Sequence, residues 1–210
     1  MAVEIYIVDD DEALAKMLGH LFKSVGLSSQ YFASAENFLD AIDPHVHGVA
    51  LIDLRMSGMD GLQCQSELQT RGIHIPVIFL TGFAEVEVAV NAMHAGAFDF
   101  VEKPFNDQLL LETVQNAVKH VEDTRALVEL KQQIRQRLES LTEREHEILR
   151  LVVDGHSSNT IGSKLSISAK TVAVHRANMM HKMQAETVAE LVKMIHIFEF
   201  SSDKANIAPK

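Results

Sequence analysis

The 210-residue sequence is poor in residues and patterns that mark several classes of protein. It contains one cysteine, Cys64, which excludes an internal disulfide and a zinc site built from several cysteines. No apolar run approaches the ~18 residues that a membrane-spanning helix needs, and the acidic start of the chain lacks the basic segment of a secretory signal. We therefore expect a soluble, cytoplasmic protein with no membrane partner.

Basic residues are scarce in the first half of the chain. Residues 1–120 contain 6 Lys and Arg residues against 17 Asp and Glu residues, whereas residues 141–199 contain 7 of each kind. The formal net charge of the whole chain is -10, which argues against a uniformly basic nucleic-acid coat protein but leaves room for a local DNA-binding face. The two halves therefore differ in electrostatic character.

The connection between the halves contains neither glycine nor proline. Residues 121–140 carry 4 charges of each sign, a composition that favours a helix over a flexible Gly/Ser tether. A Ser-Ser pair, an asparagine and a proline follow Phe200, which predicts a loose tail. The predicted organisation is a first domain at residues 1–121, a helical linker at 122–140, a second domain at 141–200 and a flexible tail at 201–210.

The first domain alternates short apolar runs with amphipathic helical patterns. Such runs, ending at polar residues, are typical of parallel strands buried on both faces. Five β-α units predict an α/β fold with an open, doubly wound, five-stranded parallel sheet, whose site lies beyond the carboxyl ends of the strands. The expected strands are Val3–Val8, Leu27–Phe32, Gly48–Ile52, Pro76–Leu80 and Phe98–Val101, and the expected helices are Glu12–Val25, Ala35–Ile42, Gly61–Thr70, Glu85–Ala95 and Asn106–Val121.

Polar side chains follow the predicted strands at the edge where the site is expected. They are Asp9, Asp10 and Asp11 after the first strand, Asp53 after the third, Thr81 after the fourth and Lys103 after the fifth. Clustered carboxylates repel one another, so the pattern predicts a bound divalent cation, Mg²⁺ or Mn²⁺. A carboxylate beside such a cation, a hydroxyl group and an ammonium group is also suited to accept a phosphoryl group, and Asp53 is the candidate acceptor.

The first domain resembles the receiver domain of two-component response regulators in the motifs IYIVDDDEAL, ALIDLRMSGMDGLQ, VIFLTGFAEVEVAV and MHAGAFDFVEKPF. This resemblance implies a flavodoxin-like fold with Asp53 as the phospho-acceptor. The metal ligands that it implies are Asp9, Asp10, Asp53 and the backbone carbonyl of Arg55. Thr81 and Lys103 then bind the phosphoryl oxygens, and Phe100 is the switch aromatic residue that turns inward. The Lys103–Pro104 peptide bond is expected to be cis.

The second domain contains helical patterns and no strand-like alternation. Thr142 and Glu145 have the spacing of a capping box, which predicts a helix that ends at Gly155. A short helix at Ser158–Leu165 and a turn are followed by a helix that Ser168 can cap and that runs to about Met183. This order is that of a helix-turn-helix unit, whose second helix enters the major groove of DNA. A closing helix is expected at Glu186–Phe198.

The helix after Ser168 has an inward apolar stripe and an outward face suited to DNA. The candidate DNA contacts on it are Lys170, Thr171, Val174, His175, Arg176, Asn178 and Lys182. The segment LTEREHEILRLVVDGHSSNTIGSKLSISAKTVAVHRANMMHKM resembles the LuxR-type helix-turn-helix of NarL/FixJ response regulators. In that family, base-reading positions cluster near Ala173, Val174 and Ala177. Because alanine cannot hydrogen-bond a base, we expect Arg176 and Asn178 to carry more of the direct readout.

The two resemblances together imply a transcriptional regulator and not an enzyme with turnover on a free substrate. The motif DFVEKPF and the long helical linker favour the FixJ-like branch of the family. The implied partners are a sensor histidine kinase, double-stranded promoter DNA, a second copy of the phosphorylated chain in a homodimer, and RNA polymerase.

Two questions stay open at this point. The linker carries an apolar stripe, Leu127, Leu130, Ile134, Leu138 and Leu141, which packs either on the chain's own domains or on a second copy in a short coiled coil. The second question is control of activity, because a DNA-binding regulator controlled without phosphorylation is the alternative function. An aspartate-dependent phosphohydrolase fits less well, since it leaves Asp53 and the DNA-binding module unexplained.

Overall fold

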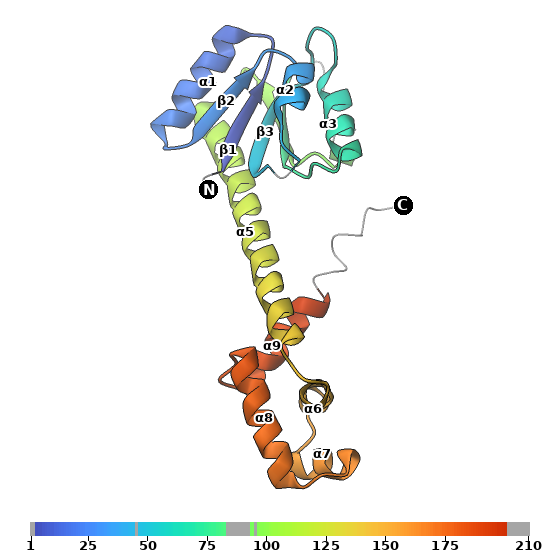
Figure 1. Cartoon of the computed structure of the whole chain (residues 1–210). Helices are drawn as coiled ribbons and strands as arrows, with labels where there is room; N and C mark the ends of the chain where they lie inside the picture. The colour runs from blue at the N-terminus through green and yellow to red at the C-terminus, as the bar shows by residue number, and fades with distance from the viewer. Residues whose placement is uncertain (1–2, 45, 83–92, 95, 201–210) are drawn as a thin grey trace. The chain divides into compact units, whose positions relative to one another are not determined.

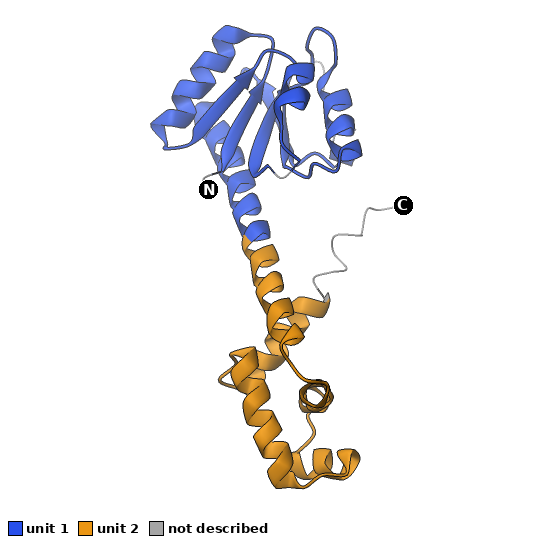
Figure 2. Cartoon of the chain, viewed as in Figure 1, with its two compact units in different colours: residues 1–125 blue, residues 126–210 orange. Residues whose placement is uncertain are grey.

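The computed structural model describes residues 3–44, 46–82, 93, 94 and 96–200. The chain divides into two compact units, Met1–Arg125 and Ala126–Lys210, called unit 1 and unit 2 in Figure 2. Within the described residues, no helix combines the length and the apolar character that crossing a bilayer requires. The helix expected at Glu85–Ala95, apart from residues 93 and 94, and the tail expected at 201–210 lie outside the described residues.

Unit 1 contains the predicted five-stranded parallel sheet, in the order β2-β1-β3-β4-β5. Figure 1 labels the first three of these strands. This order is that of the flavodoxin-like fold, and the direction of winding reverses between β1 and β3. The doubly wound α/β fold is therefore confirmed. The strands are β1 Glu4–Val8, β2 Ser28–Phe32, β3 Gly48–Asp53, β4 Val77–Gly82 and β5 Asp99–Lys103, and the helices are α1 Glu12–Ser24, α2 Ala35–Ala41, α3 Gly61–Thr70 and the first part of α5 Asp107–Glu139.

Two hydrophobic cores cover the two faces of the sheet. Ile5 and Ile7 of β1 point to a core shared with α1 and α5, whereas Tyr6 and Val8 point to a core shared with α2 and α3. Successive side chains of a strand point to opposite faces, so a strand in the middle of a covered sheet is apolar throughout. All six residues of β3 are buried, which explains why this strand reads as a continuous apolar run.

The strands β3, β4 and β5 extend one or two residues beyond the predicted ends. The cause is pairing in register, because Asp53 of β3 aligns with Leu80, and Thr81 and Gly82 of β4 align with Glu102 and Lys103. A polar residue can stay in a strand when its backbone groups pair with a neighbouring strand. Asp53, Thr81 and Lys103 are consequently held in the last residues of their strands, whereas Asp9 and Asp10 directly follow β1.

The helix α5 is one continuous helix of 33 residues, as the absence of glycine and proline predicts. Its apolar stripe is divided. Ile134, Leu138 and Leu141 pack in the core of unit 2, whereas Leu127 and Leu130 are 38% and 36% exposed. The first alternative, packing on the chain's own domain, therefore holds for the C-terminal half of the stripe.

The described residues of unit 2, up to residue 200, form the end of α5 and four further helices: α6 Glu143–Val153, α7 Ser158–Leu165, α8 Ala169–Met183 and α9 Val188–Phe200. The capping box of Thr142 and Glu145 and the cap of α8 by Ser168 are confirmed. The last helix begins two residues later than predicted, because the hydroxyl group of Thr187 accepts the N–H of Glu190 and acts as the cap.

The turn between α7 and α8 depends on a close backbone approach at Gly162. A Cβ atom at this position would lie 2.7 Å from the carbonyl oxygen of Ile167. Ser166, in the left-handed conformation, ends α7, and the N–H of Ile167 donates to the carbonyl of Gly162. The described turn therefore fixes α8 against α7 as in a helix-turn-helix unit.

Candidate functional site

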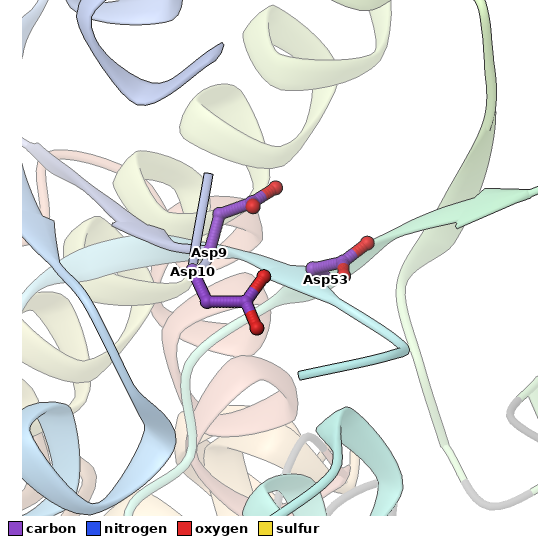
Figure 3. Close-up of side chains that lie close together, drawn as sticks. All are labelled: Asp9, Asp10 and Asp53. Carbon is purple, nitrogen blue, oxygen red and sulfur yellow. The ribbon is translucent and has the colours of Figure 1, made fainter. Parts of the chain in front are cut away.

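Three carboxylates gather at the carboxyl ends of β1 and β3, where the winding of the sheet reverses. One oxygen each from Asp9, Asp10 and Asp53 lies within 4.8 Å of the others (Figure 3). Asp9 and Asp53 are buried and Asp10 is exposed. Asp11 is not part of this cluster, because its side chain accepts the N–H groups of Ala13 and Leu14 and caps α1.

The ammonium group of Lys103 joins two of these carboxylates. Its Nζ atom lies 2.9 Å from Asp9 Oδ2 and 2.8 Å from Asp53 Oδ1. Burial alone would lower the pKa of Lys103, but hydrogen bonds to Asp53 and Asp9 raise it above its ordinary value. Lys103 therefore stays positively charged at neutral pH, and the adjoining Lys103–Pro104 peptide bond is cis, as expected.

Asp53 is held in a poorly solvated position. It is 8% exposed, and burial raises the pKa of its carboxyl group although the hydrogen bond from Lys103 lowers it. The backbone N–H of Arg55 also favours the ionised form. A carboxylate that is weakly hydrated and faces an ammonium group is suited to act as a nucleophile toward an electrophilic phosphorus atom.

Two carboxylates from other parts of the domain hold the loop after β3 by accepting hydrogen bonds from its backbone. Asp10 accepts the N–H of Ser57 at 3.0 Å, and Glu36, on α2, accepts the N–H of Met59 at 2.9 Å. Gly61, which opens α3, permits a close approach, since a Cβ atom there would lie 2.6 Å from the backbone oxygen of Asp53. The loop that carries Arg55 is thus positioned by backbone hydrogen bonds at the edge of the carboxylate cluster.

Thr81 and Phe100 lie on the neighbouring strands. Thr81 is buried near the end of β4, and its hydroxyl group donates to the carbonyl of Gly82 at 3.3 Å. Phe100 of β5 pairs in register with Phe79, and the residue is 36% exposed. The structure therefore brings Asp9, Asp10, Asp53 and Lys103 together, and it places Thr81 on the adjacent strand β4.

The outward face of α8 carries most of the predicted DNA contacts. Lys170, Thr171, Val174 and Asn178 are exposed, whereas His175, Arg176 and Lys182 are half-buried. His181, which the sequence analysis does not single out, is also exposed, and it lies seven residues after Val174 on the same face. His181 could have been found from the sequence, because residues spaced three or four apart share one face of a helix. Lys170, Val174, Asn178 and His181 have this spacing.

Lys182 has a partner inside unit 2 that the sequence analysis does not anticipate. Its Nζ atom lies 2.6 Å from Glu145 Oε2, and Glu145 is 4% exposed. The same carboxylate accepts the N–H of Thr142 in the capping box of α6. Lys182 therefore ties the end of α8 to the start of α6, a role that competes with the predicted contact to DNA.

Replacing Glu145 with Gln tests this link. Hydrogen bonds from Lys182 and from the backbone of Thr142 hold the pKa of Glu145 below its ordinary value of 4.5. A lowered pKa means that the ionised carboxylate stabilises the folded unit above about pH 4.5 and that this stabilisation is lost as the pH falls through the lowered value. We expect Glu145→Gln to lower the free energy of unfolding at neutral pH by about 1–3 kcal/mol.

The measurement is chemical denaturation followed by helical circular dichroism at neutral and at acid pH. The difference between the wild type and Glu145→Gln is expected to shrink in acid. Glu147→Gln is the matched control, because the carboxylate of Glu147 pairs with Arg144 but is 51% exposed. Equal effects of the two substitutions at neutral pH would contradict the structural role of the Glu145–Lys182 pair.

Two family models match the chain in separate regions. Residues 5–115 match the response regulator receiver domain, and residues 139–195 match the bacterial regulatory proteins of the luxR family. The two matches together cover more than half of the chain. They fall on the unit that contains the carboxylate cluster and on the unit that contains the helix-turn-helix.

Relatives resemble the chain over nearly its whole length. The transcriptional regulatory protein FixJ of Rhizobium meliloti is 42% identical over 191 residues, which are 90% of this chain and 93% of that protein. FixJ of Azorhizobium caulinodans is 38% identical over 193 residues, 92% of each chain. The structure of the response regulator StyR superposes with a TM-score of 0.78 at 34% identity, over 93% of this chain and 99% of that one. The chain therefore belongs to the NarL/FixJ family of response regulators and is FixJ-like within it.

Proposed function

We propose that the chain accepts a phosphoryl group on Asp53 from a sensor histidine kinase and then binds promoter DNA as a homodimer. The observation that carries this proposal is the position of the Lys103 ammonium group, 2.8 Å from Asp53 Oδ1 and 2.9 Å from Asp9 Oδ2. It places a fixed positive charge beside the candidate nucleophile at the edge of the sheet where ligands bind. The chain acts as a regulator, with no turnover on a free substrate.

The carboxylate cluster fits a hard divalent cation, because three carboxylate oxygens lie close enough to share one. Asp9, Asp10, Asp53 and the backbone carbonyl of Arg55 would hold Mg²⁺ or Mn²⁺. When bound, the cation would neutralise the negative charge on the oxygens of the phosphoryl group during transfer. The fastening of the loop by Asp10 and Glu36 supports the assignment of Arg55, since it holds the backbone at this edge.

In the proposed reaction, a carboxylate oxygen of Asp53 attacks the phosphorus atom, and the bond from phosphorus to the donor nitrogen breaks. The ammonium group of Lys103 breaks its ion pair with Asp9 and binds one phosphoryl oxygen. The hydroxyl group of Thr81 binds a second phosphoryl oxygen. Movement of Thr81 toward the phosphoryl group makes space beside β4, into which the exposed ring of Phe100 turns. This change in the surface of the receiver favours the homodimer.

Each predicted segment of the chain has its own function in this proposal. Residues 1–121 form the phospho-acceptor domain, 122–140 the linker, 141–200 the DNA-binding domain and 201–210 a tail, and the C-terminal end of the linker packs through Ile134 and Leu138 in the core of the DNA-binding domain. The exposed residues Lys170, Thr171, Val174 and Asn178 contact the DNA, with His175, Arg176 and Lys182 at the flanks of the helix. RNA polymerase is a further proposed partner of the DNA-bound dimer.

The test is DNA binding by the full chain with and without acetyl phosphate and Mg²⁺. The probe is a duplex enriched by the phosphorylated protein from random-sequence DNA. Phosphorylation is expected to raise the affinity by about 5- to 150-fold, the usual range of coupling between two sites. The Asp53→Asn protein is expected to show no response to acetyl phosphate.

Two other results would change the conclusion. Tight binding that is unaffected by acetyl phosphate, in the wild type and in Asp53→Asn alike, would support the alternative regulator that is controlled without phosphorylation. A failure of the folded protein to enrich any sequence would contradict DNA binding itself.

A further inference from the structure

The centre of the outward face of α8 is apolar. Val174 is 55% exposed, and the nearby alanines Ala173 and Ala177 are exposed as well. A partner that offers a small apolar group at the position of Val174 gains free energy by removing this apolar surface from water.

The segment of the chain that contains this apolar centre has an excess of positive charge. The segment from Gly155 to Ala185 contains four Lys and Arg residues and no Asp or Glu, although the whole chain is acidic. Three of the four, Lys170, Arg176 and Lys182, are spaced six residues apart on α8, so they lie on different sides of the helix. Lys170 is exposed one turn before Val174, whereas Arg176 lies toward the buried stripe of Val172 and Met179 and Lys182 pairs with Glu145. An excess of positive charge in this segment favours placement of α8 in the major groove, in which phosphates line both walls and base edges form the floor.

Several polar groups of α8 already have partners within the protein. The hydroxyl group of Thr171 pairs with that of Ser168 at 2.8 Å in the cap of the helix, and Lys182 bonds to Glu145 at 2.6 Å. Arg176 is half-buried, and it lies to one side of the line from Lys170 through Val174 to His181. Asn178 is exposed next to the apolar centre. Around Val174, the outward face therefore offers the small apolar groups of Ala173, Val174 and Ala177 and the amide of Asn178, while the exposed side chains of Lys170 and His181 lie toward the two ends of the helix.

We propose that α8 recognises its operator mainly through the 5-methyl groups of thymines, with Val174 as the central contact and Asn178 reading a neighbouring adenine. The thymine methyl group is the one apolar group on the base edges of the major groove, and an asparagine amide matches the N6 and N7 atoms of adenine. This inference rests on the proposed function, and it changes the earlier expectation that Arg176 and Asn178 share the readout. It specifies A·T pairs at the centre of each half-site.

The experiment uses the full chain phosphorylated with acetyl phosphate and Mg²⁺. A duplex is first enriched from random-sequence DNA, and each thymine of one half-site is then replaced singly by deoxyuridine, which removes the methyl group and keeps base pairing. At one or two adjacent positions, this loss is expected to weaken binding by about threefold to tenfold. The Val174→Ala protein is expected to bind the thymine duplex more weakly. At one of these positions, it is also expected to lose the preference for thymine over uracil.

Matched variants separate this effect from a change in folding. Val192→Ala removes the same atoms from a valine on α9 that is 37% exposed, and this protein is expected to keep the preference for thymine over uracil. Val174→Thr retains one methyl group at an exposed site, and this protein is expected to keep part of the preference for thymine. Enrichment of a sequence whose binding is unchanged by uracil at every position would overturn this inference and leave the proposed function intact. Absence of any enriched sequence would overturn both.

Discussion

Replacement of Asp53 with Asn is expected to abolish phosphorylation of the protein. The wild type is expected to gain one phosphoryl group on incubation with acetyl phosphate and Mg²⁺, because the Asp53 carboxylate is the nucleophile and Lys103 lies 2.8 Å from it. The amide of Asn cannot form the acyl phosphate. Intact-mass spectrometry measures the gain directly and requires neither the kinase nor the operator.

The chain offers a matched control for this experiment. Asp11 lies two residues from Asp9, but its carboxylate caps α1 and does not belong to the cluster, so Asp11→Asn is expected to gain the phosphoryl group. Asp10→Asn and omission of Mg²⁺ are both expected to reduce the gain strongly, because each weakens cation binding. A phosphoryl group that Asp53→Asn still gains would show that another residue is the acceptor.

The substitution Ile134→Ala is expected to lower the free energy of unfolding of unit 2 by about 2–5 kcal/mol. Ile134 lies on α5, before the predicted start of the DNA-binding domain, yet it is fully buried in the core that contains Ile148, Val172 and Met179. Truncating it leaves a cavity in this core. A fragment that begins at residue 141 lacks this side chain, so it is expected to be less stable than one that begins at residue 126.

Two spectroscopic signals separate the units of the full chain. Both tyrosines, Tyr6 and Tyr31, belong to unit 1, and tryptophan is absent, so tyrosine emission reports on unit 1 alone. Circular dichroism reports on the helices of both units. Ile134→Ala is expected to move the helical transition to lower denaturant concentration and to leave the tyrosine transition in place.

Leu127 provides the control, since it belongs to the same stripe of α5 but is 38% exposed. Leu127→Ala is expected to change the stability by less than about 1 kcal/mol. If Ile134→Ala and Leu127→Ala had equal and small effects, the end of α5 would not be part of the core of unit 2. That result would restore a domain boundary near residue 141.

Local sequence patterns were sufficient to predict most of the helices and strands. Alternating apolar runs and amphipathic stretches predicted the sheet of unit 1, and the caps at Thr142 and Ser168 predicted the starts of α6 and α8. Rules of parallel sheets then predicted that Asp9, Asp10 and Asp53 meet at one edge. These inferences succeeded because each depends on residues close in sequence or on a topology with few alternatives.

Element ends depended on interactions that the pattern does not contain. Strands β3, β4 and β5 continue through Asp53, Gly82 and Lys103 because neighbouring strands pair with them, and α9 begins later because Thr187 caps it. The division of the α5 stripe between buried Ile134 and exposed Leu127 likewise follows from which side chains the unit 2 helices cover. Periodicity alone gives both residues the same role.

The sequence by itself determined the family, the fold class and the candidate acceptor Asp53, since these depend on motifs and on the order of elements. Only the tertiary structure decided which charged groups neutralise one another. Lys103 pairs with Asp9 across 94 positions of the chain, and Lys182 pairs with Glu145 across 37. Such pairs form when packing brings distant elements within the few ångströms over which a charge-assisted hydrogen bond acts, and no local pattern encodes that distance.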